Sequence, residues 1–511
     1  MLKRTALGLA LSLLLGTGAA YAEAPLAAAA EAKQFVIVEG LLQEASIDVN
    51  ATQGDGSTAL HWAVYWDNVD LARALLVKGA DVEAATRLGA TPLYLAAVNG
   101  NATMLRLLLE AGADAKATVL QNEETPLMFA ARAGSVEAVQ VLADAGADLD
   151  AEDAYRGATA LLFAAEQNHA AVVGWLIDHG AKPNARTNTG VTESRRGPAL
   201  PTGGLSGLML AARENGIDTV KVLLAKQALV NQQSAEGHTA LLAAIQNANL
   251  DIANLLLDAG ADVNLMNDRG WNPLYMAVKM RSLEKGTMPN PYVDMDGMYA
   301  VIERLVANGA NGNARLQADT EVHNSIRSTW LDEAGATAFL RASLCGDLKV
   351  MKLLLAHGAD PKIATSDGTT ALMALAGVGY TKGFMKDVGT LDESLEAMRI
   401  LIDAGIDLEA SNDDQVRAIH GAAHKNFVQG IQMLVDAGAD LTAHSNRKGQ
   451  FQGEGTLEGN TVLDWADGFQ TGMESAIYNA EAVELLEKLL KERNLPLERL
   501  AGTIGGRVVQ N

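Results

Sequence analysis

A short sequence pattern returns along most of the 511 residues of this chain. It consists of a threonine, then proline or alanine, then an apolar residue, and its regular copies are 33 or 34 residues apart, as at Thr58, Thr91, Thr125 and Thr159. A second marker, Gly-Ala-Asp, begins 21 residues after the threonine, for example at Gly79. Two markers in phase at this period predict a repeat protein, in which each unit packs mainly on its neighbours.

One repeat unit reads as a pair of short helices. Thr91 can cap the first helix, Pro92 suits its first turn, and Gly100 ends it. A second helix over residues 103–110 carries the larger apolar side chains and stops at Gly112. Each helix has two or three turns and is marginal alone, so the stability must come from stacking neighbours.

This pattern resembles the ankyrin repeat, whose signature is T-P-L-H-x-A followed by L-L-x-x-G-A-D-V-N. The resemblance covers roughly residues 25–495 and implies an all-α repeat fold, an ankyrin-type helix-turn-helix solenoid of about twelve units with hairpin-like connecting loops. The family's histidine is present only at His61 and His420, so the hydrogen-bond network attributed to it should be thinner here. The chain looks similar to exported ankyrin proteins of Gram-negative bacteria.

The first 22 residues are predicted to be a secretory signal peptide. Lys3 and Arg4 precede an apolar run, and an A-Y-A motif ending at Ala22 supplies a cleavage site. The apolar run is shorter than the roughly 20 residues that a membrane span needs. We therefore expect a periplasmic or secreted protein.

The rest of the chain is predicted to be one solenoid, residues 23–495, followed by a C-terminal tail, residues 496–511. Irregular spacing of the markers predicts insertions, and in repeat proteins insertions often carry binding. The insertions are expected near residues 185–204, 280–298, 312–336, 377–392, 441–460 and 467–479.

Composition and motifs exclude several classes of protein. A hydrophobic content of 49% excludes wholesale disorder, and a net charge of −22 argues against nucleic acid or an anionic membrane as partner. A single cysteine, Cys345, excludes a disulfide scaffold; this thiol is expected to be partly buried, with an exposed reactive thiol as the alternative. No P-loop, nucleophile elbow or dinucleotide motif occurs, so we expect no enzyme and no cofactor.

Two sequence features have the outline of a metal site. His420 and His424 are four residues apart on one predicted helix, but no glutamate completes an H-E-x-x-H motif. Asp294 and Asp296 look like the start of a calcium loop whose remaining ligands are missing. We therefore expect structural roles for these residues and no metal.

By the ankyrin resemblance, the surface that binds a partner is the concave face, and its variable positions lie just before the threonine and seven or eight residues after it. These positions are rich in arginine and aromatic residues, which are enriched at interface hot spots. They are Tyr65, Trp66, Arg87, Leu88, Asn99, Arg132, Tyr155, Arg156, Arg213, Glu214, His238, Arg269, Trp271 and Lys279.

We accordingly expect a non-catalytic scaffold that binds another protein of the bacterial envelope, without nucleic acid or membrane insertion and as a monomer. A further possibility is a stress-protective or inhibitor role, in which binding itself blocks the partner's site. The alternative is a small-molecule-sensing or hydrolytic protein, with a pocket formed by the inserted loops. If the inserted loops converge on one cleft that also contains histidine and acidic residues, this alternative function is favoured.

Overall fold

The computed structural model describes residues 24–192, 200–281, 293–318, 331–380, 388–446, 459–468, 478–499, 503–504 and 507–508. These residues contain 24 helices and three short antiparallel ladders of two strands. They form two compact units, an N-terminal unit that ends at Ala235 and a C-terminal unit that begins at Glu236. The predicted signal peptide lies outside the described residues, so the signal peptide and the two boundaries between the three predicted segments remain predictions.

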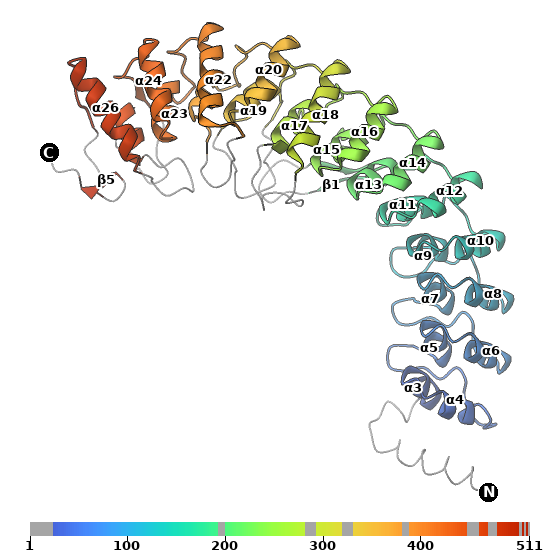
Figure 1. Ribbon diagram of the computed structural model, residues 1–511. Helices are drawn as coiled ribbons and strands as arrows, with labels where there is room; N and C mark the ends of the chain where they lie inside the picture. The colour runs from blue at the N-terminus through green and yellow to red at the C-terminus, as the bar shows by residue number, and fades with distance from the viewer. Residues whose placement is uncertain are drawn as a thin grey trace. The chain divides into compact units, whose positions relative to one another are not determined.

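The N-terminal unit is built from helix pairs in two layers (Figure 1). The first helices pack side by side and are α3 (Pro25–Glu31), α5 (Ala59–Tyr65), α7 (Pro92–Val98), α9 (Pro126–Ala133), α11 (Ala160–Glu166) and α13 (Gly207–Arg213). The second helices are α4 (Phe35–Leu41), α6 (Val69–Val77), α8 (Ala102–Glu110), α10 (Val136–Asp144), α12 (Ala170–Asp178) and α14 (Ile217–Ala225). The turns between repeats extend from the side of α5, α7 and α9 that faces away from the second helices (Figure 1).

The C-terminal unit repeats this arrangement. Its first helices are α15 (Ala240–Gln246), α17 (Pro273–Arg281), α19 (Ala338–Leu344), α21 (Ala371–Ala376), α23 (Ala418–His424) and α25 (Val462–Gly468). Its second helices are α16 (Leu250–Asp258), α18 (Met295–Ala307), α20 (Leu348–Ala356), α22 (Leu391–Asp403), α24 (Val428–Asp436) and α26 (Ala480–Glu492). The predicted all-α solenoid of helix pairs is confirmed. Among the helices of the described residues, none combines the length and apolar character needed to cross a bilayer.

The residues at the helix ends explain where each helix begins and stops. Thr91 Oγ1 accepts a hydrogen bond from the Tyr94 N–H at 3.2 Å, and Asn101 Oδ1 accepts one from the Met104 N–H at 3.0 Å. Gly112 has a φ of 103°, a conformation that strains any residue with a Cβ, and it ends the second helix. The predicted threonine caps and glycine stops are therefore confirmed in this repeat.

At seven of the turns between repeats, the side chain four residues after the turn glycine, or after Ser46 in the first repeat, joins one repeat to the next. In the N-terminal unit, Glu83 Oε1 accepts a hydrogen bond from the backbone N–H of Asp114 at 2.7 Å. In the C-terminal unit, Asn264 Oδ1 accepts one from the Asn311 N–H at 2.8 Å. The same position acts in this way at Asn50, Asp150, Asn184, Asn313 and Glu409. These bonds connect the turns of successive repeats.

The two histidines of the T-P-L-H pattern make the inter-repeat bonds that the sequence predicts. His61 Nδ1 accepts the N–H of Thr58 at 3.2 Å, which leaves Nε2 to donate to the carbonyl of Ala90 at 3.0 Å. His420 donates in the same way to Ala443 at 3.1 Å. Methionine and leucine side chains, which hold this position in other repeats, carry no N–H group and cannot donate the bond to the next repeat.

The first predicted insertion folds back on itself as a β-hairpin. Strand β1 (Thr189–Thr192) pairs antiparallel with β2 (Leu200–Gly203). Arg186 joins the two arms at the base, because its Nε donates to the carbonyl of Gly204 at 3.0 Å. Its Nη2 donates to the carbonyl of Gln233 in the next turn at 2.8 Å.

The insertion near residues 312–336 has the same device at its base. Arg315 Nε donates to the carbonyl of Gly335 at 3.1 Å, and its Nη2 donates to the carbonyl of Ala364 at 3.0 Å. The insertion near residues 441–460 closes with β3 (His444–Ser445) paired to β4 (Asn460–Thr461). In all three insertions, described residues hold the two arms together at the base.

Three of the insertions lie between the two helices of one repeat, near residues 280–298, 377–392 and 467–479. The second helix that follows each of them is longer than its neighbours. Helices α18, α22 and α26 each have 13 residues, whereas α16, α20 and α24 have nine. The added residues form about one more helical turn.

The residues after 495 pack back on the last repeat. Arg499 forms ion pairs with Asp467 and Glu487, both at 2.9 Å. Strands β5 (Thr503–Ile504) and β6 (Arg507–Val508) pair with each other, and β5 contacts α25. This segment, predicted as a tail, is therefore partly ordered against the repeat.

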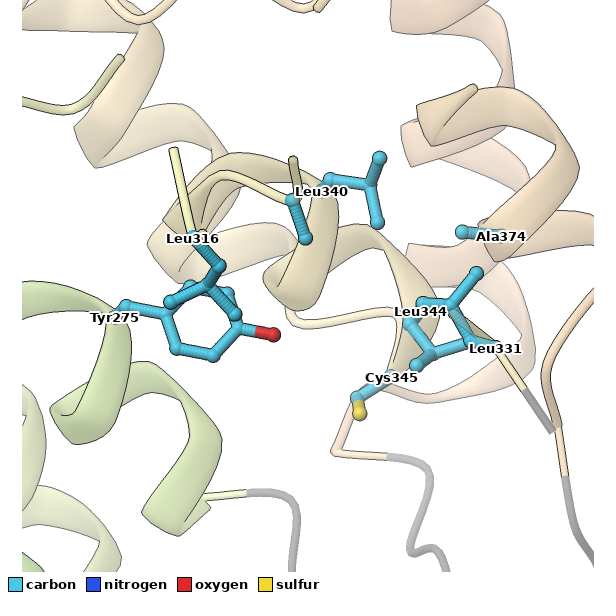
Figure 2. Close-up of a cluster of buried hydrophobic side chains, with 8 residues drawn as sticks. Tyr275, Leu316, Leu331, Leu340, Leu344, Cys345 and Ala374 are labelled. Carbon is cyan, nitrogen blue, oxygen red and sulfur yellow. The ribbon is translucent and has the colours of Figure 1, made fainter. Parts of the chain in front are cut away.

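A buried apolar cluster surrounds α19 in the C-terminal unit, as Figure 2 shows. Tyr275 on α17 contributes its ring, and Cys345, at the end of α19, is 2% exposed. The buried alternative for the Cys345 thiol is thus the one that the structure shows. The other members are Leu316, Leu331, Ala336, Leu340, Leu344 and Ala374.

Candidate functional site

The N-terminal unit has a polar pocket of about 660 Å³ between its inter-repeat turns and its first helices. The turns before α9 and α11 form one side, and the C-terminal ends of α9, α11 and α13 form the other. The lining residues are Asn122, Glu124, Arg132, Asp153, Tyr155, Arg156, Phe163, Glu166, Gln167, Asn168 and Glu214. Four of the predicted binding residues, Arg132, Tyr155, Arg156 and Glu214, therefore meet in one place.

A buried aspartate shapes the turn that carries two of these residues. Asp153 is 3% exposed, and its Oδ1 accepts the backbone N–H groups of Tyr155, at 2.9 Å, and of Arg156. Its Oδ2 accepts the N–H of Ala158 at 3.2 Å. These bonds fix the turn, so that the Tyr155 ring projects into solvent, 76% exposed, and Arg156 lines the pocket.

An ion-pair chain crosses the pocket from the turn to the helix ends. Arg156 donates from both terminal nitrogens to the two carboxylate oxygens of Glu166 at 3.2 Å, and its guanidinium lies 5.3 Å from the ring centre of Phe163. Arg213 reaches Glu166 at 3.4 Å and Glu214 at 2.7 Å. Hydrogen bonding to Glu166 raises the pKa of Arg156. Because these groups are partly exposed, the pairs hold side-chain geometry more than they stabilise the fold.

In the part of the chain that the structure describes, Glu124, unlike Glu166, lines the pocket without forming an ion pair with either of its arginines. Burial raises the pKa of Glu124, and the negative charge of Asp153 adds to this, against the opposing effects of Arg132, Arg156 and a hydrogen bond from the Asn122 side chain. Among the ion pairs of the described residues, none joins Glu124 to either arginine. The Glu124 carboxylate is thus held near a second carboxylate without a paired cation.

Outside the pocket, some predicted residues of the N-terminal unit are exposed, whereas others pack against neighbouring side chains. Arg87 and Leu88 are exposed at a turn tip, Leu88 to 71%. Tyr65 is 50% exposed, but the Trp66 ring beside it lies under the Lys33 ammonium, 3.6 Å from the ring centre. Trp66 therefore packs within the unit.

Asn99 also has a structural role that its predicted binding role did not include. Its side-chain nitrogen donates to the carbonyl of Val64 and to Asp67 Oδ1, both at 3.0 Å. The amide thus joins two repeats, although the residue itself is exposed.

The predicted residues of the C-terminal unit are half-buried or buried. His238 and Trp271 are half-buried and pack edge to face with ring centres 5.7 Å apart, and burial lowers the pKa of His238. Arg269 is half-buried, and its carbonyl accepts the backbone N–H of Gln317 at 2.9 Å. Trp271 also packs against the apolar cluster around α19.

The prediction that Lys279 lies on an exposed binding surface is wrong. Its side chain is buried and pairs with Glu333 at 3.2 Å. Helix α17 continues to Arg281 and has nine residues, whereas the neighbouring α15 and α19 have seven. The position seven residues after the repeat's first marker, Asn272, therefore remains helical and is covered by the turn that carries Glu333.

The pocket also contains residues that the sequence analysis did not single out. Glu124 directly precedes Thr125, and Glu166 and Gln167 lie seven and eight residues after Thr159. These are the same variable positions from which the other candidates were taken, so the signal was present in the sequence. Asp153 and Phe163 lie at other positions, and only the fold shows that they line the pocket.

The possible metal motifs have structural roles. Both ring nitrogens of His420 are engaged, Nδ1 by the N–H of Arg417 at 3.0 Å and Nε2 by Ala443. Asp294 caps α18 by accepting the N–H groups of Asp296 and Gly297. Within the described ranges, no group of three or more histidine, cysteine, aspartate or glutamate residues is placed to hold a metal.

The alternative of a pocket formed by the inserted loops concerns segments of which the central residues lie outside the described ones. These are residues 193–199, 282–292, 319–330, 381–387, 447–458 and 469–477. The 660 Å³ pocket is lined by ordinary repeat positions, and its lining includes no residue of those insertions.

Comparison with protein families identifies the architecture. A model of three ankyrin repeats matches residues 26–119, 93–187 and 208–285, and a single ankyrin-repeat model matches residues 334–366. Together the matches cover more than half of the chain. The chain therefore belongs to the ankyrin-repeat family, whose repeats mediate protein–protein binding.

Individual relatives share only part of their length with this chain. An ankyrin repeat protein of fowlpox virus is 29% identical over 206 residues, which are 40% of this chain and 50% of the viral protein. Human mitochondrial disaggregase is 30% identical over 169 residues, or 32% of this chain and 24% of the human protein. An ankyrin repeat-containing protein of Treponema pallidum is 29% identical over 136 residues, or 27% of this chain and 35% of that protein. This chain thus spans half or less of these relatives.

Proposed function

We propose that this chain is a non-catalytic scaffold of the bacterial envelope that binds a partner protein on the first-helix and turn face of its N-terminal unit. The observation that carries the proposal is the 660 Å³ pocket, in which Arg132, Tyr155, Arg156 and Glu214 converge from three repeats. Arginine and tyrosine are residue types that supply much of the binding energy at protein interfaces.

The exposed side chains beside this pocket also support a protein partner. Tyr155 and Leu88 extend from turn tips with 76% and 71% of their surface exposed, and Arg87 is exposed beside Leu88. Large apolar side chains held at such tips expose surface that a partner can cover. Because Asp153 already fixes the Tyr155 turn, binding would require little ordering of that turn.

The envelope location is supported by the amino-terminal sequence. Lys3, Arg4, the apolar run and the motif ending at Ala22 have the order of a secretory signal. We propose export with cleavage after Ala22 and a monomeric mature protein. Amino-terminal sequencing of the protein from an envelope fraction should begin at Glu23, and light scattering should give the monomer mass. An uncleaved cytoplasmic protein would contradict the localisation.

Site-specific photo-crosslinking tests the binding face directly. A photoreactive phenylalanine analogue replaces Tyr155 in one variant and Val77 in another, since Val77 is 82% exposed on second helix α6. We expect a discrete adduct with one envelope protein from position 155 and none from position 77. Loss of that adduct in a Tyr155-analogue protein that also carries Arg132→Ala would connect it to the pocket. Equal adducts from both positions, or none from position 155, would reject this face.

A further inference from the structure

The pocket of the N-terminal unit has an uncompensated negative charge. Its lining includes four carboxylates and two guanidinium groups. Arg156 is engaged with Glu166, and Glu214 is engaged with Arg213 at the edge of the pocket. Among the ion pairs of the described residues, none includes Glu124 or Asp153, and Arg132 and Arg156 act on Glu124 only through space.

The two remaining carboxylates differ in what they can offer a ligand. Asp153 is buried, and three backbone N–H groups occupy its oxygens. Glu124 is only half-buried and lines the cavity. Glu124 is therefore the group that can pair directly with an incoming charge, while Asp153 adds to the negative potential from behind.

The walls of the cavity suit a long side chain with a charged end. Phe163 lines the cavity but is only 3% exposed, and the Arg156 guanidinium already lies over its ring, 5.3 Å from the ring centre. The Tyr155 ring is exposed at the cavity edge, and an aromatic face of this kind attracts ammonium and guanidinium groups. A volume of about 660 Å³ holds more than one side chain, so neighbouring backbone of an extended segment also fits.

We propose that this pocket receives a lysine or arginine side chain from an extended segment of the partner protein, with Glu124 as the carboxylate that pairs with it. The inference rests on the proposed function, because it names the chemistry of the partner at that same face. The carboxylates of Glu124 and Asp153 lie at a partly desolvated site, so they favour a positively charged side chain and disfavour an acidic one.

The electrostatics of Glu124 agree with this assignment. Burial and Asp153 raise the pKa of Glu124 in the folded protein, so its negative form is less favourable there than in water. A cation seated beside Glu124 would reverse this effect and lower the pKa. Binding of the cation should therefore weaken when Glu124 becomes protonated at low pH.

The test uses the full mature protein and three capped pentapeptides as probes. The peptides are Gly-Ser-Arg-Ser-Gly and its versions with citrulline or glutamate in the centre, where citrulline keeps the shape of arginine without its charge. Ligand-observed NMR titration should show saturable binding of the arginine peptide, at least about tenfold tighter than the citrulline peptide, and no binding of the glutamate peptide. The variant Glu124→Gln should remove that preference. The matched variant Glu110→Gln, at an exposed position of second helix α8, should keep it.

Two outcomes overturn the inference. One is equal binding of the arginine and citrulline peptides, or no saturable binding of the arginine peptide at about 10 mM. The other is an arginine preference that Glu124→Gln leaves unchanged. Crosslinking from position 155 separates this inference from the proposed function. A partner adduct without arginine preference rejects only the inference, whereas arginine preference without an adduct rejects only the partner face.

Discussion

Lys279 and Glu333 form an ion pair of 3.2 Å in the C-terminal unit, and their side chains are only 5% and 0% exposed. Glu333 also accepts a hydrogen bond from the Arg341 guanidinium at 3.3 Å and another from the Tyr275 hydroxyl at 3.0 Å. One carboxylate thus gathers donors from α17 and α19, where Tyr275 takes the place of the T-P-L-H histidine. Buried charges of this kind tolerate the loss of a partner poorly.

Removing the shared carboxylate should destabilise this unit more than removing one of its cations. Glu333→Gln leaves Lys279 and Arg341 buried without that carboxylate and should cost about 3–5 kcal/mol. Lys279→Met leaves Glu333 bonded to Arg341 and Tyr275 and should cost about 2 kcal/mol. Hydrogen exchange of peptides from α17 and α19, followed by mass spectrometry, measures both losses.

An exposed pair in the same unit provides the control. Lys352 and Glu396 lie 2.6 Å apart with about half of each side chain exposed. Lys352→Met should change the free energy of opening by less than about 1 kcal/mol. A Glu333→Gln protein as well protected as the Lys352→Met protein would contradict the role assigned to the buried cluster.

Arg186 and Arg315 should each stabilise the base of the insertion that they join. Each guanidinium donates to one carbonyl across its insertion and to another in the next repeat. Arg186→Ala and Arg315→Ala should each cost about 1–3 kcal/mol, because two charge-assisted bonds are lost at a partly exposed site. Thermal unfolding measures the change. Arg73→Ala, at an exposed position of α6, should stay within about 0.5 kcal/mol of the unmodified protein, and a similar shift in all three would reject the prediction.

His420 should make stability depend on pH on the acidic side of neutrality. Burial lowers the pKa of His420 from 6.5 to about 3 in the folded protein, so the folded state favours the neutral imidazole ring. The stability that this shift contributes is complete above pH 6.5 and is lost as pH falls toward 3, in total on the order of 5 kcal/mol. His420→Met should be less stable at pH 7, because the bond to Ala443 is lost, but should lose less stability between pH 6.5 and 4. Urea unfolding at several pH values measures both slopes; parallel slopes would argue against His420 as a source of this dependence.

Cys345 should react slowly with thiol reagents in the native protein. Its side chain is 2% exposed within the cluster of Figure 2, so a reagent must wait for local opening of α19. An opening that costs about 3 kcal/mol slows labelling by a factor of about 100 relative to the unfolded chain. Spectrophotometric labelling with and without guanidinium chloride gives this ratio, and a ratio near one would show an accessible thiol.

Much of the repeat architecture could be predicted because its determinants are local. The cap at Thr91 and the stop at Gly112 act within a few residues of their own position, and Glu83 reaches only the equivalent turn of the next repeat. Part of the pocket was predictable for the same reason. Arg132 and Tyr155 hold variable positions, and regular stacking brings those positions together.

What the repeat pattern could not show depends on residues that break it. Lys279 pairs with a residue 54 positions later, across an insertion whose path has no counterpart in the repeat. The charge of the pocket likewise follows from which carboxylate each arginine selects, since Arg156 pairs with Glu166 and leaves Glu124 without a cation. The sequence by itself determined the helices, their caps and the face that the turns present, because those depend on short-range bonds repeated along the chain. Only the tertiary structure decided which charges are buried, paired or available, because that depends on distances between residues of different repeats.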